Sequence, residues 1–305
     1  MELPAMEAML FPRLMEARVE RLTLTGGEPF AHPEILAIAE RVRQLDLGLT
    51  ICTNGTLIDR PSIETLKSLG EVKVNVSLDG FSNRSHGKFR GDPKSFDTTV
   101  ETIALLGHHG LLKGVLVTPN QLSPLEEYAK LCDFARQCGA EYVLMNPLSS
   151  LGRGVKGIRR LGASEEFMRT LAYENGAFAN DLEIVQIRFP NDELPLTPCQ
   201  AGQILYVFAD GALTVCPYLV FAARTPTSKH DPNEFMVGNV FRDSDIAARI
   251  DSYPLEDRVT LRSDPSCRSC ELSEGCGRGC PAAVVAAGGR IGKRDTEMCP
   301  IEEAA

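Results

Sequence analysis

Seven of the ten cysteines in this 305-residue sequence fall into one spaced pattern, which constrains the fold more than any other feature. Eleven residues separate Cys199 from Gly211, and four more separate Gly211 from Cys216. The other five follow as CxxCx5CxxxC and one later cysteine: Cys267, Cys270, Cys276, Cys280 and Cys299. Reduced thiolates at this density bind soft metal centres. Seven ligands exceed the four of one tetrahedral centre, so we predict two centres.

The overall composition is typical of a globular protein, with 43% hydrophobic and 24% charged residues. A net charge of −9 argues against a nucleic-acid-binding surface. No apolar run approaches the ~18–20 residues that span a bilayer, and the mixed Glu and Arg over residues 1–18 do not resemble a signal peptide. We therefore expect a cytoplasmic protein that binds neither nucleic acid nor membrane, and whose thiols stay reduced.

Thiol spacing by itself is also compatible with zinc or with disulfides. A structural zinc site uses CxxC pairs too, so the spacing does not separate zinc from an iron–sulfur cluster. Disulfides would require an oxidising compartment, and the sequence carries no secretory signal. The three remaining cysteines have no ligand spacing and are predicted to be buried structural thiols: Cys52, Cys132 and Cys138.

The first half of the chain alternates short apolar segments with helical ones, which indicates parallel βαβ units. We expect strands over Arg21–Gly27, Leu49–Gly55, Val72–Gly80, Leu112–Thr118 and Tyr142–Pro147. Helical spacing predicts helices over Met1–Ala17, Pro33–Leu45, Pro61–Leu69, Phe96–His108 and Pro124–Cys138. The strands end in the turns TGGEP, CTNGT, SLDG, TPNQ and NPLS. Because ligands bind at the carboxyl ends of parallel strands, these turns should share one mouth.

The composition changes near Gly152. The basic, glycine-rich segment Gly152–Arg160 is predicted to be a solvated linker, or a mobile loop that helps to hold an anionic substrate. A helix near Ser164–Ala177 and an irregular, proline-containing stretch up to Cys199 should follow. Asp210 and Gly211 then form the turn of a predicted hairpin.

The cysteine pattern, with its glycine before Cys216, closely resembles the SPASM domain of radical SAM (S-adenosylmethionine) enzymes. The resemblance implies two auxiliary [4Fe–4S] clusters. Four cysteines would hold the outer cluster, namely Cys267, Cys270, Cys276 and Cys299, and three would hold the inner one, namely Cys199, Cys216 and Cys280. Fully ligated members carry another cysteine where this chain has Leu205, so the inner cluster would have an open iron or an unidentified ligand.

The turns of the first half resemble motifs of the same superfamily. Gly-Gly-Glu-Pro after the segment RLTLT matches its GGEP motif, Thr53-Asn54-Gly55 matches its TNG motif, and the polar end of the next strand also fits. By this resemblance, the SAM-binding residues would be Gly26, Gly27, Glu28, Pro29, Asn54, Ser77, Asp79 and Arg90. Structural turns and a solvent-facing arginine are the alternatives. For Asn120 we favour a turn or capping role, and we assign no role to the histidines.

Radical SAM chemistry requires a cluster held by a CxxxCxxC motif ahead of GGEP, and this chain has no cysteine before Cys52. Two interpretations compete. The chain is truncated at its N-terminus, or it is a natural relative that has lost the motif. The first is favoured because the GGEP, TNG and SLDG turns are retained.

The resemblance therefore implies an α/β fold: a partial (β/α)6 barrel that lacks its first strand over residues 1–150, a bridging segment over 151–198 and a SPASM domain over 199–305. Its activity would be that of an oxidoreductase or maturase that modifies a peptide or protein through a 5′-deoxyadenosyl radical, inactive in this truncated chain. An external donor such as flavodoxin or ferredoxin would supply electrons, and SAM binding would depend on the missing cluster. The alternatives are a small-molecule substrate, such as a sugar or tetrapyrrole, and a non-catalytic iron–sulfur electron-transfer protein.

Overall fold

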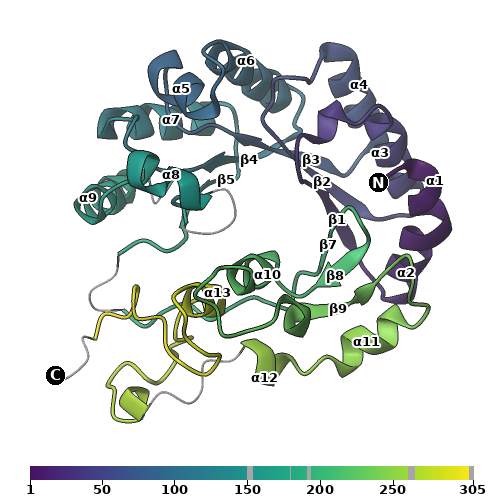
Figure 1. Cartoon of the computed structure of the whole chain (residues 1–305). Helices are drawn as coiled ribbons and strands as arrows, with labels where there is room; N and C mark the ends of the chain where they lie inside the picture. Colours follow the sequence, from purple (N-terminus) through teal and green to yellow (C-terminus); the bar gives the residue numbers. More distant parts are fainter. Residues whose placement is uncertain (150–153, 179, 191–193, 260–264, 302–305) are drawn as a thin grey trace. The chain divides into compact units, whose positions relative to one another are not determined.

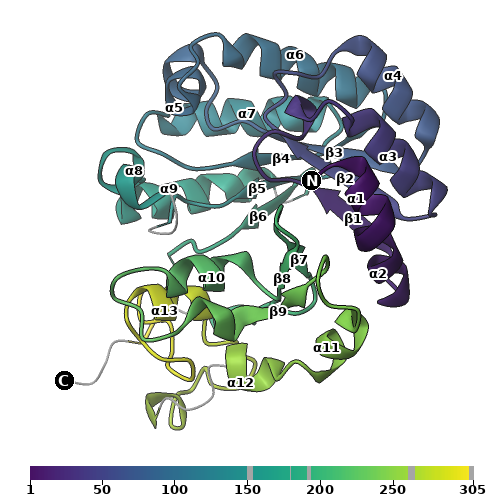
Figure 2. The same cartoon turned by 45° about the vertical axis from the view of Figure 1, so that its right-hand side comes forward.

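The computed structural model describes residues 1–149, 154–178, 180–190, 194–259 and 265–301. The chain divides into two compact units, which are drawn in Figures 1 and 2. One, called here the sheet unit, comprises Val19–Ser149 and Gly157–Phe189. The other, called the cysteine unit, comprises Met1–Arg18, Ser150–Lys156 and Pro190–Ala305.

The sheet unit is built on a parallel sheet whose strand order follows the sequence, as the βαβ pattern predicts. Its strands are β1 (Arg21–Leu24), β2 (Gly48–Thr53), β3 (Val72–Ser77), β4 (Leu112–Val117), β5 (Tyr142–Met145) and β6 (Glu183–Gln186). Each of the five predicted strands is present, and their turns begin one to three residues earlier than predicted. The shared direction of the strands brings these turns to one edge of the sheet, which confirms the predicted mouth.

The last strand, β6, lies where the sequence predicted an irregular stretch, so that prediction is wrong. It pairs in parallel with β5, from Tyr142↔Glu183 to Met145↔Gln186. The sheet therefore continues into the segment 151–198 that was expected to bridge two domains. The strand has four residues with Glu and Gln at its ends, too short for an alternating pattern to stand out.

Helices cover one face of the sheet (Figure 1). They are α3 (Ile35–Gln44), α4 (Arg60–Leu69), α6 (Ser95–His108), α7 (Leu125–Gln137) and α9 (Glu165–Asn175), with short turns η2 (Pro29–Ala31), η3 (Asn83–Gly87), α5 (Lys88–Arg90) and η4 (Gly176–Phe178). Val74 and Val76 of β3 are fully buried, as are Ile63 of α4 and Leu106 of α6. Burying apolar side chains of this size stabilises the fold by roughly 1.5–3 kcal/mol each, so this layer is the main core of the unit.

The basic segment predicted to be a linker forms a helix over its described part. Helix α8 spans Gly154–Leu161, and Gly152 and Arg153 lie outside the described residues. Its basic residues recur at helical spacing despite two glycines, and the glycines led us to predict a loop. The helix leads directly to the bridge that pairs Gly162 with Asn120.

The cysteine unit combines short elements with long connections. The N-terminal helical segment is α1 (Leu3–Ala5), η1 (Met6–Leu10) and α2 (Phe11–Glu16), and an antiparallel sheet contains β7 (Tyr206–Val207), β8 (Ala212–Thr214) and β9 (Met236–Asn239). The remaining elements are α10 (Pro217–Ala223), η5 (Pro232–Phe235), α11 (Ile246–Ser252), α12 (Leu255–Val259), η6 (Pro265–Cys267) and α13 (Pro281–Ala286). Helices α10 and α13 pack together and bury Val220 and Val285 completely.

The predicted hairpin is present as β7 and β8, with Asp210 and Gly211 in its turn. Gly211 has a φ of +84°, and a Cβ there would lie 2.5 Å from the ring of Phe241. Only glycine meets both conditions at this position.

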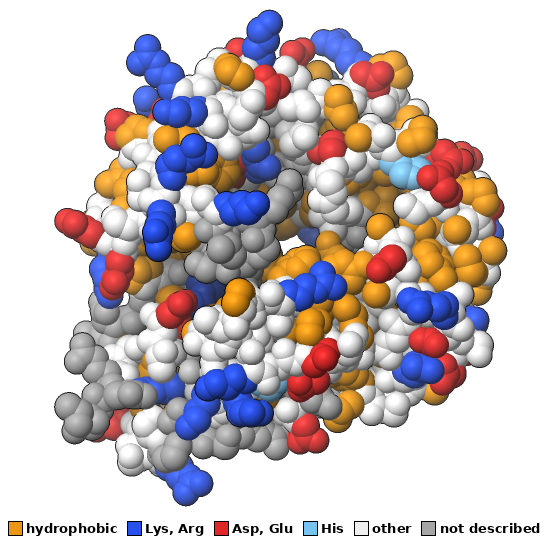
Figure 3. Space-filling view, in the orientation of Figure 1, with side chains coloured by type: hydrophobic (Ala, Val, Ile, Leu, Met, Phe, Trp, Pro, Cys, Tyr) orange, Lys and Arg blue, Asp and Glu red, His pale blue; other side chains and the backbone are white. Residues whose placement is uncertain are grey.

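The surface of the chain carries charges of both signs. On the face drawn in Figure 3, Lys and Arg side chains are interspersed with Asp and Glu side chains. Mixed charge of this kind is usual for the water-facing surface of a globular protein. Within the described part of the chain, no helix is both long and apolar enough to cross a membrane.

Candidate cofactor-binding turns and cysteine centres

The carboxylate of Glu28 joins the GGEP turn to the turn of the next strand. It accepts hydrogen bonds from the hydroxyl of Thr53 (2.6 Å), the amide of Asn54 (2.8 Å) and the amide of Phe30 (3.1 Å). A charged acceptor makes such bonds shorter and stronger than a neutral one. Two of the predicted motifs, GGEP and TNG, are therefore in direct contact.

The two glycines ahead of Glu28 leave the backbone of this turn accessible. Gly26 and Gly27 are exposed, and no atom lies within 4 Å of a Cβ built on either. Gly26 has a φ of +128°, a conformation that other residues rarely adopt. Pro29 is buried and begins the short helix η2. The turn thus offers free backbone groups beside a fixed carboxylate.

Helix α6 holds the TNG turn in place. The side-chain oxygen of Asn54 accepts from the amide and hydroxyl of Thr56. Two threonines of α6 bond the turn carbonyls: Thr99 donates to Asn54 O at 3.0 Å, and Thr102 donates to Gly55 O at 2.7 Å. Both threonines are buried, so these bonds are made away from water.

Asp79 is fully buried and connects the ends of β3 and β4. One carboxylate oxygen accepts from the amide of Thr118 at 2.8 Å, and the other is paired with Arg90. Ser77 ends β3 and is half-buried. The structure thus brings Asp79 and Arg90 together as an ion pair, and a contact of either with SAM stays a prediction.

Asn120 has the turn role that the sequence favoured. Its amide nitrogen donates to Asp79 O and Thr118 O, and its oxygen accepts from the amide of Leu122. The hydroxyl of Ser123 donates a second hydrogen bond to Asp79 O at 2.8 Å. These contacts fix the SLDG turn against the TPNQ turn.

Sequence reasoning missed His86 and Glu127, which also hold this turn. The amide of Asp79 donates to Nδ1 of His86 at 3.0 Å, so this ring nitrogen is unprotonated. Burial lowers the pKa of His86 to about 4, against the opposing effect of the Asp79 charge. Glu127 of α7 accepts from the amide of Phe81 and the hydroxyl of Ser85. A buried histidine has no sequence pattern of its own, so one sequence does not reveal it.

A chain of polar contacts crosses the strands on the opposite side of the sheet from Val74 and Val76. Tyr142 donates to the oxygen of Asn75 at 2.9 Å, and the nitrogen of Asn75 contacts the sulfur of Cys52 at 3.7 Å. Burial raises the pKa of the Cys52 thiol. The three cysteines predicted to be buried therefore differ: Cys132 is fully buried with a pKa raised to about 12, whereas Cys52 and Cys138 are half-buried.

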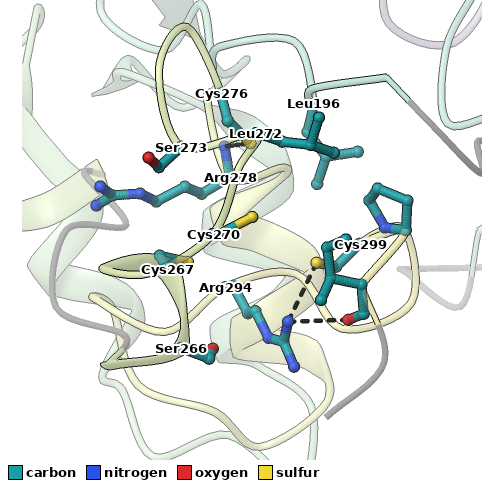
Figure 4. Close-up of a pocket in the computed structure, with 12 residues that line it drawn as sticks. Leu196, Ser266, Cys267, Cys270, Leu272, Ser273, Cys276, Arg278, Arg294 and Cys299 are labelled. Carbon is teal, nitrogen blue, oxygen red and sulfur yellow. Dashed lines mark hydrogen bonds between the residues drawn. The ribbon is translucent and has the colours of Figure 1, made fainter. Parts of the chain in front are cut away.

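In the cysteine unit, the four cysteines assigned to the outer cluster line one cavity of about 20 Å³ (Figure 4). They are Cys267, Cys270, Cys276 and Cys299. Arg278 and Arg294 lie in the same wall. The amide of Arg278 donates to the Cys276 sulfur at 3.4 Å, and the guanidinium of Arg294 donates to the Cys299 sulfur at 3.2 Å. These donors, and the positive charge of Arg294, would stabilise negatively charged sulfur ligands of a metal centre.

Among the three cysteines assigned to the inner cluster, the charge of Cys280 acts on the other two, Cys199 and Cys216. The pKa of Cys216 is raised to about 11, chiefly by burial and in smaller part by the charges of Cys280 and Cys199. The pKa of Cys199 is raised by burial and also by Cys280. Like charges act at short range, so these thiols share one neighbourhood. Amides of Leu219 and Tyr218 donate to the Cys216 sulfur.

Leu205 lines a different, apolar cavity of about 50 Å³ together with Val215, Val237 and Ile250. This is the position at which fully ligated SPASM members carry an additional cysteine. Four of the seven thiols thus line one cavity, and the other three are Cys199, Cys216 and Cys280. All-thiol donor sets of this kind fit iron–sulfur clusters, and backbone amides already point at three of the sulfurs.

Comparisons with known proteins agree with this architecture. The Radical SAM superfamily profile matches residues 7–135. The antilisterial bacteriocin subtilosin biosynthesis protein AlbA of Bacillus subtilis is 28% identical over 223 residues, which are 72% of this chain and 47% of that protein. The AdoMet-dependent heme synthase of Methanosarcina barkeri is 32% identical over 133 residues, 44% of this chain and 38% of that protein.

Among solved structures, SuiB of Streptococcus suis bound to S-adenosylmethionine has a TM-score of 0.70 at 16% identity. The match covers 94% of this chain and 68% of that one, and it shows a shared fold. Residues 7–135 thus resemble the radical SAM domain, and the chain shares its fold with SuiB. It spans about half the length, or less, of the two curated relatives named above.

Proposed function

We propose that this chain is the SAM-binding and auxiliary-cluster portion of a radical SAM enzyme that modifies a peptide. The observation that carries the proposal is the sorting of the seven C-terminal thiols into two neighbourhoods, in a chain that also has a radical SAM domain. A peptide substrate is supported by SuiB, which has the same fold and has been solved with its precursor peptide SuiA.

The residues of the turns would bind SAM at the mouth of the sheet. The exposed backbone of Gly26 and Gly27 would receive the amino group, with Glu28 holding the turn and its carboxylate beside it. Asn54 and Ser77 would complete the site at the ends of β2 and β3. SAM cleavage itself needs a further cluster on a CxxxCxxC motif, which these 305 residues do not contain.

The cysteine unit would hold two [4Fe–4S] clusters, one in each neighbourhood. Anaerobic reconstitution should yield roughly eight irons and eight sulfides per chain. Cys276→Ala and Cys216→Ala should each lower the iron content by about half, because each removes a ligand from a different cluster. Stoichiometric zinc with negligible sulfide would contradict the proposal, as would a loss of all iron in both variants.

A peptide substrate can be tested without turnover. The reconstituted protein should bind a peptide encoded beside its gene and leave a tetrapyrrole such as an iron porphyrin unbound, measured by fluorescence anisotropy and absorbance titration. The opposite selectivity would favour the second candidate, a small-molecule radical SAM enzyme. That candidate is supported by the 32% identity to the heme synthase.

Cleavage of SAM would need both an electron donor and the cluster motif that these residues do not contain. A cytoplasmic flavodoxin or ferredoxin would donate electrons, and SAM incubated with this chain alone should yield 5′-deoxyadenosine only at background. Cys52, Cys132 and Cys138 do not form CxxxCxxC. Production well above background would contradict the expectation that the cleaving cluster is not bound by these residues.

A further inference from the structure

Two oppositely charged neighbours, Arg294 and Asp295, lie buried within the cysteine unit. Arg294 is 5% exposed and Asp295 is 2% exposed. Buried charges are costly unless polar partners compensate them, so such a pair usually serves a specific purpose. Neither residue belongs to the CxxC pattern, and no sequence motif predicted a role for them.

Arg294 contacts the outer group of cysteines. Its Nη1 donates to the sulfur of Cys299 at 3.2 Å and to the carbonyl of Ile301 at 2.9 Å (Figure 4). It also lines the cavity that the four outer thiols share. A fixed positive charge therefore lies against one ligand of the outer group.

Asp295 contacts the inner group. Its carboxylate accepts from the amide of Cys280 at 3.1 Å, and its backbone carbonyl accepts from the amide of Cys299 at 3.0 Å. Gly279 permits this approach, because a Cβ there would lie 2.3 Å from Asp295 Cβ. A negative charge is thus held beside the inner ligand Cys280, one residue from the positive charge beside the outer ligand Cys299.

We propose that the Arg294–Asp295 pair sets the order of the two reduction potentials, with the outer cluster above the inner one. This inference rests on the proposed cluster function. Hydrogen-bond donors and positive charge near cluster sulfurs favour the reduced, more negative state, and a carboxylate disfavours it. Arg294 raises the outer potential, and Asp295 lowers the inner one. Both are positioning residues, since they act through cysteine ligands.

The consequence is a direction for one electron. When the pair of clusters holds one electron, that electron resides mainly on the outer cluster. An electron on the inner cluster passes to the outer one, so the inner cluster is oxidised as the outer cluster is reduced. The outer group would therefore be the site from which an external iron–sulfur or flavin protein exchanges electrons. The inner group would be oxidised and ready to accept the next electron.

The test is a redox titration followed by electron paramagnetic resonance, on the reconstituted chain and on Arg294→Gln and Asp295→Asn. Signals are assigned from Cys216→Ala, which keeps the outer set, and Cys276→Ala, which keeps the inner set. In the one-electron state, each charge variant should lower the ratio of reduced outer to reduced inner cluster at least tenfold. For a one-electron couple, tenfold corresponds to about 59 mV.

Arg290→Gln and Asp251→Asn are the matched controls, because both residues are exposed in the same unit. They should leave the ratio unchanged. If Arg294→Gln fails to take up iron, Asp295→Asn decides the question alone. Iron and sulfide are measured in every sample: two clusters with an unchanged ratio would overturn this inference only, whereas the absence of clusters would overturn the proposed function as well.

Discussion

At the scale of single residues, polar side chains near the mouth form hydrogen bonds to the protein's own backbone. Glu28, Asp79 and His86 each bond backbone amides of neighbouring turns. The buried acceptors matter because an amide left without a partner costs about 1–3 kcal/mol. The turns are thereby held in place before any ligand binds.

Replacing Glu28 tests whether its hydrogen bonds hold the turns in place. Glu28→Ala should lower the free energy of unfolding by about 1–3 kcal/mol, because the amides of Asn54 and Phe30 lose their acceptor. Urea unfolding with an unchanged slope measures the effect. Glu64→Ala, an exposed position on α4, is the control, and equal midpoints for the two variants would contradict the prediction.

His86 predicts a pH dependence. Its pKa falls from 6.5 to about 4 on folding, so between these values the unfolded chain binds a proton that the folded one does not. Stability should therefore decline as the pH falls from 6.5 to 4, by about 3 kcal/mol in all. His86→Asn should remove this decline relative to the wild type in urea titrations. His108→Asn, at an exposed site, should retain it.

At the scale of elements, the helices do more than cover the apolar face of the sheet. Helix α6 buries Ile103 and Leu106, and on the adjoining positions it presents threonines to the TNG turn. A single helix thus packs the core and fixes the geometry of a candidate cofactor turn. The apolar periodicity predicts only the first of these roles.

Thr102→Val isolates the second role, because valine keeps the shape and loses the hydroxyl. We expect a loss of about 1–3 kcal/mol, since the buried carbonyl of Gly55 loses its donor. Thr98→Val, exposed on the same helix, should change stability by less than about 0.5 kcal/mol. Similar values for both variants in urea unfolding would indicate that the hydroxyl is dispensable.

At the scale of the whole molecule, the two units differ in how their folds are supported. The sheet unit has a parallel sheet with a continuous apolar layer. In its described part, the cysteine unit has strands of two to four residues and, outside its N-terminal segment, α-helices of five to seven residues. Such short elements bury little surface, so bound metal should contribute much of this unit's stability.

Removal of iron should therefore act on one unit. After chelation under anaerobic conditions, hydrogen exchange measured by mass spectrometry should accelerate across residues 194–301 and stay unchanged in β2 and β3. The reason is that metal-binding free energy stabilises the segment that supplies the ligands. Faster exchange in the parallel sheet, or none in the cysteine unit, would contradict this prediction.

Much of the architecture was determined by the sequence alone. Strand and helix periods placed five of the six strands, and the Asp-Gly turn placed the hairpin, because these signals depend on local spacing. The cysteine spacing likewise predicted two ligand groups, and their binding of two clusters stays a prediction. Two local predictions were wrong: the glycines of Gly154–Leu161 concealed a helix, and β6 was too short to show alternation.

Only the tertiary structure decided which polar groups meet. Asp79 and Arg90 form an ion pair that the sequence did not predict, and Glu28 bonds the turn 25 residues further on. The role proposed for Arg294 and Asp295 depends on their contacts with Cys299 and Cys280, which only the folded chain brings about. Such pairings depend on the packing of distant segments and on burial, and neither leaves a periodic trace along the chain.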